Sequence, residues 1–152
     1  MRTRNAGVLA DVGLVMADLA EEVLAAGNTI AVVGLSRDPA KAAHAVPASL
    51  QAAGFRIIPV HPSATELLGE KAYRTLADIP EPVDLVDVFR PSPEAPGIAE
   101  QAVAIGAKAL WLQQGIMSAE ARAIAEAGGL DYVENRCTAV VRAIAQISKL
   151  PR

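Results

Sequence analysis

A segment near residue 34 combines residue types that bind phosphate groups. Glycine lets a ligand approach the backbone closely, serine supplies a hydroxyl group, and arginine and lysine supply positive charge. All of these occur in the stretch Gly34-Leu35-Ser36-Arg37-Asp38-Pro39-Ala40-Lys41. If this loop enters a helix, the N–H groups at the helix N-terminus also favour an anion. We therefore expect a phosphate-bearing ligand here; the alternative is structural, with Asp38 capping the helix and both cations solvated.

Two further loops follow apolar runs and carry side chains that suit a ligand. One run ends in Phe89-Arg90; the ring suits a nucleobase or an aliphatic tail, and the guanidinium suits a phosphate. A core position for Phe89 and a solvated charge at Arg90 are the alternatives. The next run contains the sole tryptophan, Trp111, which we expect in the core. It is followed by Gln113-Gln114-Gly115, which we expect to face the same crevice.

The first loop lacks the patterns of other nucleotide sites. The dinucleotide-binding pattern G-x-G-x-x-G needs three glycines, and the loop has only Gly34. That pattern also expects an acidic residue about 20 positions further on, where this chain reads Pro59-Val60-His61-Pro62. The P-loop pattern G-x-x-x-x-G-K-S/T does not occur either. These departures argue against NAD as the ligand of this loop and against a P-loop enzyme.

No group of residues predicts a catalytic or metal centre. The only histidines, His44 and His61, have no cysteine or carboxylate cluster at zinc-like spacing. No G-x-S-x-G elbow marks an activated serine. The single cysteine, Cys137, precedes the last helical pattern, where a helix N-terminus can activate a thiol. A small buried hydrophobe is the alternative for this cysteine.

The elements that must position these loops alternate along the chain. Short apolar runs predict strands over 29–34, 55–60, 84–89, 108–112 and 131–134. Helical spacing predicts helices over 10–26, 46–53, 66–77, 94–106, 118–127 and 138–149, with a kink at Pro47 or a start near Val46. This alternation predicts an α/β fold, a doubly wound sheet of about five parallel strands with helices on both faces. We expect one domain over 28–152, with the helical segment 1–27 packed on it.

Composition excludes several classes of protein. The chain has 152 residues, 52% of them hydrophobic and 3% aromatic, with a net charge of -3. This apolar content argues against disorder, and a single cysteine argues against a disulfide scaffold. No apolar run is long enough for a membrane span, and the start lacks the pattern of a signal peptide. A chain with a net negative charge lacks the positive charge that binding to a nucleic-acid backbone requires. We therefore expect a cytoplasmic protein that binds neither membrane nor nucleic acid.

Six segments, taken in order, resemble a known family. They are Val33 to Lys41, Val46-Pro47 with Leu50 to Phe55, Ile58 to Pro62, Asp84 to Arg90, Trp111 to Ile116, and Asn135-Arg136-Cys137. Together they are similar to the small stand-alone CoA-binding proteins, and hence to the N-terminal CoA-binding domain of the succinyl-CoA synthetase α subunit. The resemblance covers about residues 28–149. It departs from the family at His61, where the usual residue is asparagine.

The resemblance implies a Rossmann-like fold that binds coenzyme A at the carboxyl ends of the strands. Gly34, Ser36, Arg37 and Lys41 would then hold phosphates, and Val60, His61 and Pro62 would border the adenosine. Phe89 and Arg90 would flank the pantetheine or the pyrophosphate. The expected cofactor-binding set is Gly34, Leu35, Ser36, Arg37, Lys41, Val60, His61, Pro62, Phe89, Arg90 and Gln113.

The family implies a binding function without an established reaction, because the phosphorylated histidine of the synthetase belongs to a second domain. We expect no room for that domain in 152 residues. Two alternatives stay open. One is an enzyme, either an NAD(P)-dependent dehydrogenase or an acyl-CoA enzyme that uses Cys137. The other is a CoA-sensing subunit of a larger complex; whether the partner is another protein or a second copy of this chain also stays open.

Overall fold

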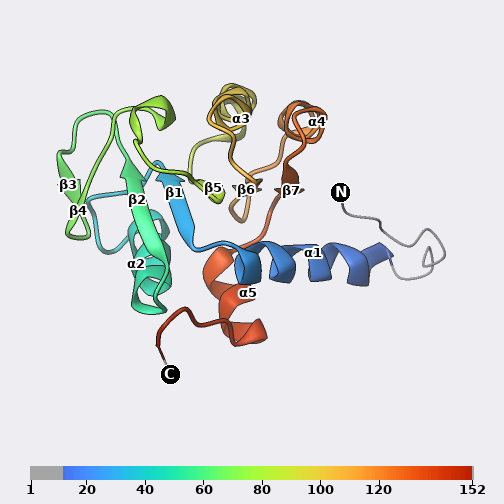
Figure 1. Ribbon diagram of the computed structural model, residues 1–152, viewed down its shortest axis with the longest axis horizontal. Coiled ribbons are helices and arrows are strands. Elements are labelled where there is room, and N and C mark those ends of the chain that lie inside the picture. Colours follow the sequence, from blue (N-terminus) through green and yellow to red (C-terminus); the bar gives the residue numbers. More distant parts are fainter. Residues whose placement is uncertain (1–11, 152) are drawn as a thin grey trace.

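Five parallel strands form the central sheet of the protein, which a computed structural model describes over residues 12–151. The strands are β1 (Thr29–Val33), β2 (Arg56–Val60), β5 (Leu85–Val88), β6 (Ala109–Leu112) and β7 (Asp131–Val133). They are arranged in the order β2-β1-β5-β6-β7, and each neighbouring pair is parallel (Figure 1). The predicted α/β class, with a Rossmann-like doubly wound sheet of about five parallel strands, is confirmed.

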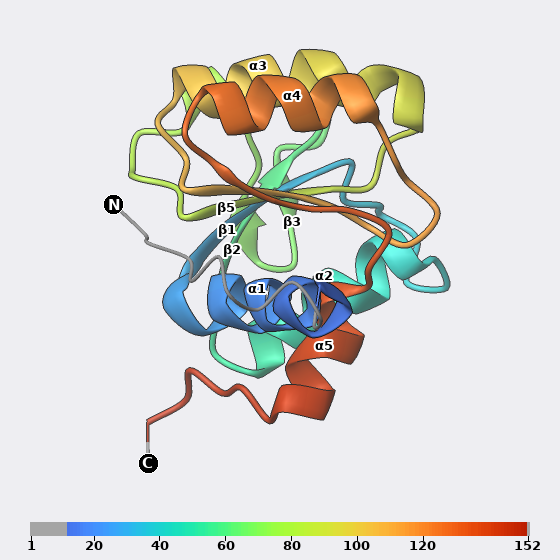
Figure 2. The same ribbon diagram turned by 90° about the vertical axis from the view of Figure 1, so that its right-hand side faces the viewer.

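Helices cover both faces of the sheet (Figure 2). On one face lie α3 (Ala95–Ala104) and α4 (Ala119–Ala127), and on the other lie α1 (Val12–Ala26), α2 (Ala42–Ala52) and α5 (Thr138–Ala145). Because side chains alternate along a strand, Ile30 and Val32 join the core beneath α1, α2 and α5, whereas Ala31 joins the core beneath α3 and α4. Strands buried in this way on both faces explain the uninterrupted apolar runs of the sequence.

The second half of α1 belongs to the first of these cores. Its buried side chains are Leu19, Ala20, Val23 and Leu24. Residues 1–11 of the predicted segment 1–27 lie outside the described residues, as does the start of the helix predicted over 10–26. The division of the chain near residue 27 stays a prediction.

The strand order creates a crevice at one edge of the sheet. Strand β1 has β2 on one side and β5 on the other, so the connections that follow β1 and β5 diverge. Open parallel sheets bind ligands outside the carboxyl ends of the strands at such a point. The loops singled out by their residue types follow β1, β2, β5 and β6, and all four therefore leave the same edge.

The helix predicted over 66–77 is wrong. The stretch forms a hairpin of β3 (Glu66–Leu67) and β4 (Glu70–Lys71), followed by the 3-10 helix η2 (Leu76–Asp78). The turn residues Leu68 and Gly69 have φ values of 54° and 74°, as in a type I′ hairpin turn. Leucine is unusual at such a position. Here its side chain packs on the core, and its carbonyl accepts a hydrogen bond of 2.9 Å from the Gln51 side chain.

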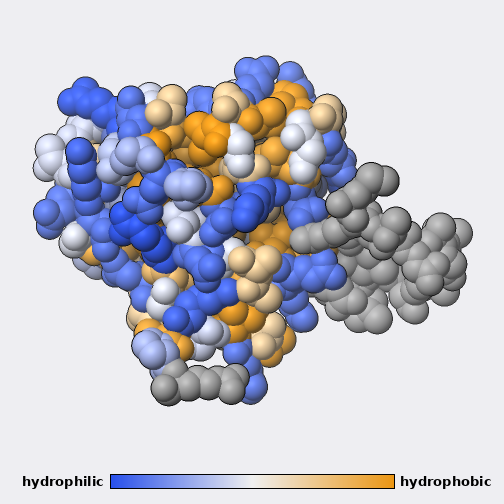
Figure 3. Space-filling model, in the orientation of Figure 1, coloured by the Kyte–Doolittle hydropathy of each residue, from blue (hydrophilic) through white to orange (hydrophobic). Residues whose placement is uncertain are grey.

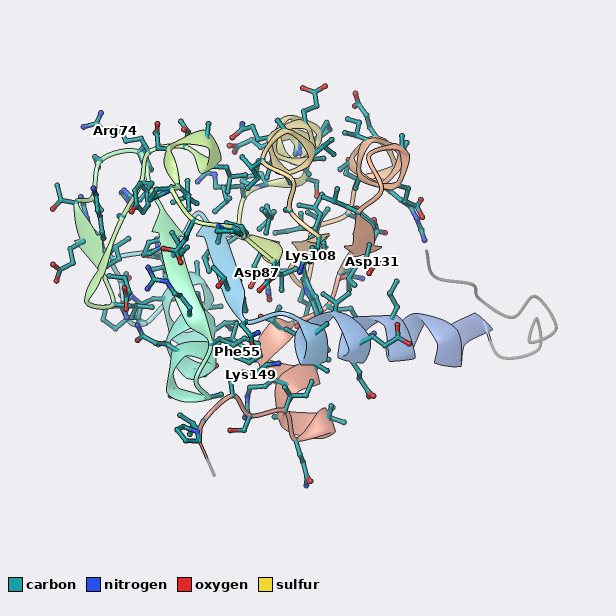
Figure 4. All side chains as sticks on the ribbon, in the orientation of Figure 1. Phe55, Arg74, Asp87, Lys108, Asp131 and Lys149 are labelled. Carbon is teal, nitrogen blue, oxygen red and sulfur yellow. The ribbon has the colours of Figure 1, made fainter. Side chains whose placement is uncertain are left out.

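Two helix boundaries differ from the prediction. Helix α2 begins at Ala42, four residues before the predicted start, and continues through Pro47. Helix α5 ends at Ala145 instead of residue 149, because Gln146 has a φ of 55° and turns the chain. The chain then crosses to the end of α2, where the Lys149 N–H donates to the Ala53 carbonyl over 2.7 Å. Figure 4 shows Lys149 beside Phe55, whose ring lies 5.5 Å from the ammonium group.

The end of the molecule formed by β2, β3 and β4 has a hydrophilic surface (Figure 3). On β2, the Arg56 guanidinium pairs with Glu81 over 2.6 Å and with Glu70 over 3.1 Å. These two ion pairs tie the start of β2 to the hairpin and to the segment before β5. Within residues 12–151, no helix is both long enough and apolar enough to cross a bilayer.

Candidate ligand-binding site

The loops at the carboxyl ends of β1, β2 and β5 enclose a cavity of about 810 Å³. Its walls come from the β1–α2 connection, the residues after β2, the segment after β4 and the connection from β5 to α3. Ten of the eleven residues predicted for the site line this cavity: Gly34, Leu35, Ser36, Arg37, Lys41, Val60, His61, Pro62, Phe89 and Arg90. The exception is Gln113, which lines a smaller cavity next to it.

The β1–α2 connection holds its shape through its own hydrogen bonds. The N–H of Gly34 donates to the Val60 carbonyl over 3.2 Å, and that of Ser36 donates to the Ala43 carbonyl over 3.1 Å. The Ser36 hydroxyl oxygen accepts a bond of 3.0 Å from the Asp38 N–H. The N–H groups of Gly34, Ser36 and Asp38 are therefore already used. The Ser36 hydroxyl proton and the cationic side chains of this loop can still meet a ligand.

Pro47 explains why Ser36 finds this partner. Proline has no N–H, so it cannot bond to the carbonyl four residues earlier in the helix. That carbonyl belongs to Ala43, and it accepts the Ser36 N–H instead. The His44 side chain strengthens the same junction, since its Nδ1 lies 2.7 Å from the Ser36 carbonyl. A proline inside α2 thus fixes the loop that precedes the helix.

Helix α2 begins beside the cavity without a side-chain cap. Its N-cap residue is Lys41, whose side chain makes no capping bond. Asp38, the cap expected in the structural alternative, accepts a bond of 3.0 Å from the Ala40 N–H and does not cap α2. The first-turn residue Ala43 lines the cavity. Uncapped N–H groups and the positive end of the helix dipole therefore face a space that an anion can enter.

His61 stabilises the turn that follows β2. Its Nδ1 accepts the N–H of Ser63 over 3.1 Å and that of Ala64 over 2.9 Å, so the neutral ring carries its proton on Nε2. Burial lowers the pKa of His61, and the positive charge of Arg37 lowers it further. The oxygen of an asparagine side chain accepts hydrogen bonds in the same way. This explains how histidine can stand where the resembled family has asparagine.

The connection after β5 contributes an arginine that is paired with a carboxylate. Arg90 donates to Glu94 from Nη2 over 2.8 Å and from Nε over 3.2 Å, and both side chains are half-exposed. Gly34 packs directly on this arginine: a Cβ at residue 34 would lie 2.8 Å from the Arg90 Cδ and 2.9 Å from the Phe89 carbonyl oxygen. With a φ of +93°, residue 34 must be glycine for reasons of both space and conformation.

Arg74 and Thr75 also line the cavity, and sequence reasoning missed them. The backbone of Tyr73 pairs with the end of β2, because its carbonyl accepts the His61 N–H over 2.8 Å and its N–H donates to Pro59 over 2.9 Å. This pairing carries Arg74 to the outer rim of the molecule (Figure 4). The available signal was Gly69, a turn residue in the middle of the stretch that the helical interpretation of 66–77 treated as one element.

Positive charge exceeds negative charge around the cavity. The lining residues include the cations Arg37, Lys41, Arg74 and Arg90 and the carboxylates Asp38 and Glu94. In the described part of the chain, only Arg90 among these cations belongs to a salt bridge. Arg37 donates to the neutral Ser63 hydroxyl over 3.4 Å. Three cations thus remain without a carboxylate partner at the mouth of one cavity.

A second cavity of about 280 Å³ adjoins the first. It is lined by Ala42, Ala43, Val46, Phe89, Gln113, Gln114, Ile116 and Cys137. Ala43 and Phe89 line both cavities. Cys137 is partly exposed and is the N-cap of α5. The preceding residue is held by buried Trp111, whose Nε1 donates to the Arg136 carbonyl over 2.8 Å.

Gln113 joins the second cavity to a buried polar network. Only 4% of Gln113 is exposed. Its Nε2 donates to Asp87 Oδ1 over 2.7 Å and to Thr138 Oγ1 over 2.8 Å, and the Thr138 hydroxyl donates to Asp87 Oδ2 over 3.3 Å. Burial raises the pKa of Asp87 to about 7, although the hydrogen bonds from Gln113 and Thr138 oppose the shift. The network links β5, the end of β6 and the first residue of α5.

Comparison with known proteins identifies the family. Residues 28–143 match the family model described as the CoA binding domain. The chain belongs to this family. The matched region includes every residue of both cavities. The resemblance to CoA-binding proteins found in the sequence is confirmed.

Individual proteins resemble the chain over different shares of its length. The chain is 39% identical to the uncharacterized protein YneT of Bacillus subtilis over 126 residues, which are 83% of this chain and 93% of YneT. A solved structure of a hypothetical protein from Pyrococcus horikoshii is 31% identical, with a TM-score of 0.82 over 97% of this chain and 99% of that one. The chain is also 26% identical to the ADP-forming acetate–CoA ligase of Methanocaldococcus jannaschii over 81 residues, 53% of this chain but only 12% of the ligase.

Proposed function

We propose that the protein binds coenzyme A or an acyl-CoA at the carboxyl ends of β2, β1 and β5, without catalysing a reaction on it. The family suggests the ligand. The observation that carries the proposal is one cavity in which the uncapped start of α2 meets three cations that have no carboxylate partner within residues 12–151. CoA carries several phosphate groups, and phosphate is the chemistry that helix N-termini and cationic side chains bind.

The proposed pose follows the edge of the sheet. Ser36, Arg37 and Lys41 would hold phosphates at the start of α2, and the turn containing His61 would border the adenosine after β2. Phe89 would then lie against the pantetheine. Arg90 already pairs with Glu94 through Nε and Nη2, so its Nη1 is the group left to donate to a phosphate unless the ion pair opens.

Isothermal titration with CoA, dephospho-CoA and NAD tests this proposal. We expect saturable binding of CoA that is clearly tighter than that of NAD, because the end of β2 lacks the carboxylate that binds the ribose in NAD-binding folds. Dephospho-CoA should bind more weakly than CoA if the cations at the rim contact the 3′-phosphate. Absence of saturable binding up to millimolar CoA would falsify the proposal.

One observation favours a second candidate, an acyl-CoA enzyme that uses Cys137. The thiol lines the cavity next to the proposed phosphate site and is partly exposed. Thiol labelling at neutral pH, with and without CoA, separates the candidates: an inert thiol that CoA does not protect would eliminate this one. A role as a CoA-sensing subunit stays a prediction, which a pull-down from cell extract with and without CoA would test.

A further inference from the structure

The two cavities form one path along the carboxyl edge of the sheet. The main cavity lies at the ends of β2, β1 and β5, and the second lies at the ends of β5 and β6. With strands about 4.8 Å apart, the path crosses three strand spacings, roughly 14 Å. Phe89, at the end of β5, lines both parts. An elongated ligand whose phosphates occupy the first cavity can therefore reach the second with its other end.

The second cavity differs from the first in its chemistry. No charged residue lines it, and most of its surface comes from aliphatic and aromatic carbon. Gln113 supplies a buried polar group in the wall, and its Nε2 is already committed to Asp87 and Thr138. Its carbonyl oxygen is therefore the atom left to accept a hydrogen bond, and an amide N–H of a pantetheine arm is a matching donor.

The volume of the second cavity limits what it can hold. About 280 Å³ corresponds to roughly nine times the 30 Å³ that a water molecule occupies in the liquid. On that measure the space accommodates about nine non-hydrogen atoms. A thioester with a short aliphatic chain fits this limit, and a long fatty acyl chain exceeds it.

We propose that the second cavity is a subsite for the acyl group of a short-chain acyl-CoA thioester. The protein would then prefer such thioesters to free CoA, because an apolar chain leaves water for an apolar wall. This inference rests on the proposed function, since the same ligand must place its phosphates in the main cavity. Beyond CoA binding, the inference specifies a short-chain acyl group and the residues of the second cavity that select it.

Isothermal titration with CoA, acetyl-CoA, butyryl-CoA and octanoyl-CoA tests the preference. Each buried methylene is expected to increase affinity about fourfold, so butyryl-CoA, with two more methylenes, should bind roughly fifteenfold more tightly than acetyl-CoA. Octanoyl-CoA should lose part of this gain, because its acyl group and thioester sulfur already number ten non-hydrogen atoms, and the end of the pantetheine arm beside Gln113 takes up further space in the cavity.

Two variants change the volume of the second cavity in opposite directions. Ala42→Leu places a larger side chain at its edge on the exposed start of α2, and should bring the affinities for butyryl-CoA and CoA close together. Ala45→Leu, on the same helix but outside both cavities, is the matched control and should keep the wild-type ratio. Ile116→Ala enlarges the cavity and should move the best chain length from butyryl toward octanoyl.

The outcomes separate this inference from the proposed function. If CoA binds but butyryl-CoA binds no more tightly, and the two cavity variants leave the ratios unchanged, the acyl subsite is wrong and CoA binding stands. If no CoA species binds, the proposed function fails and the acyl subsite fails with it. A chain-length optimum that shifts with Ile116→Ala supports the subsite even if Ala42→Leu does not fold.

Discussion

Lys41 occupies a position where its charge has few competing partners. It is the N-cap residue of α2, lines the main cavity and belongs to none of the salt bridges within residues 12–151. Arg90, across the cavity, is held by Glu94. Two cations of the same site are therefore in different states before a ligand arrives, and they should respond differently to mutation.

Lys41→Ala should weaken CoA binding about tenfold with little effect on the melting temperature. A lost charge-assisted hydrogen bond is worth about 1.5 kcal/mol or more, whereas the exposed side chain contributes little to the core. Isothermal titration and thermal unfolding measure the two effects. Lys71→Ala is the matched control, because Lys71 lies over the Tyr73 ring outside the cavity. Unchanged CoA affinity in Lys41→Ala would remove this lysine from the site.

Glu94→Gln should strengthen CoA binding several-fold at low salt. The substitution releases Arg90 from its ion pair and removes a negative charge from the cavity wall. Because the pair is half-exposed, salt screens the effect, and the gain should shrink as ionic strength rises. Titrations at two salt concentrations measure it, with Glu100→Gln, on the outer side of α3, as the control. Weaker binding in Glu94→Gln would show that the carboxylate assists the ligand.

At this scale, residue type and position after a strand were sufficient for most of the candidate site. Loops that follow parallel strands meet at one edge, so Ser36 and Arg90 could be grouped from the sequence pattern, whereas His61 was placed with them by the family resemblance. Arg74 could not be grouped with them, because its place depends on backbone pairing between Tyr73 and β2. The pairing of Arg90 with Glu94 depends on the 3-10 turn η3 (Ser92–Glu94), which the sequence did not indicate.

At the scale of elements, the start of α2 decides the shape of the main cavity. Because Pro47 has no N–H, the Ala43 carbonyl accepts a hydrogen bond from the Ser36 N–H of the preceding loop, and no side chain caps the helix. The apolar runs predicted the five strands because strands buried on both faces carry few polar residues. They could not predict the β3–β4 hairpin. Leu68 adopts a positive φ in its turn, and its side chain packs on the core.

Pro47→Ala should lower CoA affinity several-fold while α2 stays helical. Alanine restores an N–H that competes for the Ala43 carbonyl, so the Ser36 N–H loses its partner and the loop loosens. Titration gives the affinity, and circular dichroism confirms the helix. Pro96→Ala in the first turn of α3 is the control, since it alters a proline in a helix away from the loop. Wild-type affinity in Pro47→Ala would mean that the loop holds its shape without this bond.

At the scale of the whole molecule, the buried carboxylate of Asp87 connects the sheet to α5 through Thr138 and to the wall of the second cavity through Gln113. Asp87 is fully buried, and burial raises its pKa from an ordinary 3.8 to about 7. The folded protein therefore holds a proton that the unfolded chain releases at a lower pH. The contribution of Asp87 to stability therefore falls as pH rises from about 4 to 7, because at this residue the folded state binds more protons than the unfolded chain across that window.

Asp87→Asn should remove this dependence. The amide keeps the shape of the side chain without the buried charge, so the free energy of unfolding of the variant, relative to wild type, should rise between pH 4 and pH 8 by on the order of 4 kcal/mol. Urea unfolding at several pH values measures the difference, with Asp78→Asn, at the exposed helix η2, as the control. Parallel stability curves for wild type and Asp87→Asn would contradict a buried carboxylate that titrates near neutrality.

A crystal structure of the protein with saturating CoA tests the central claim most directly. We predict CoA in the main cavity, with its phosphates within hydrogen-bond distance of Arg37 or Lys41 and its pantetheine against Phe89. CoA bound at any other surface, or a main cavity without CoA at a concentration that saturates the protein in solution, would contradict the account.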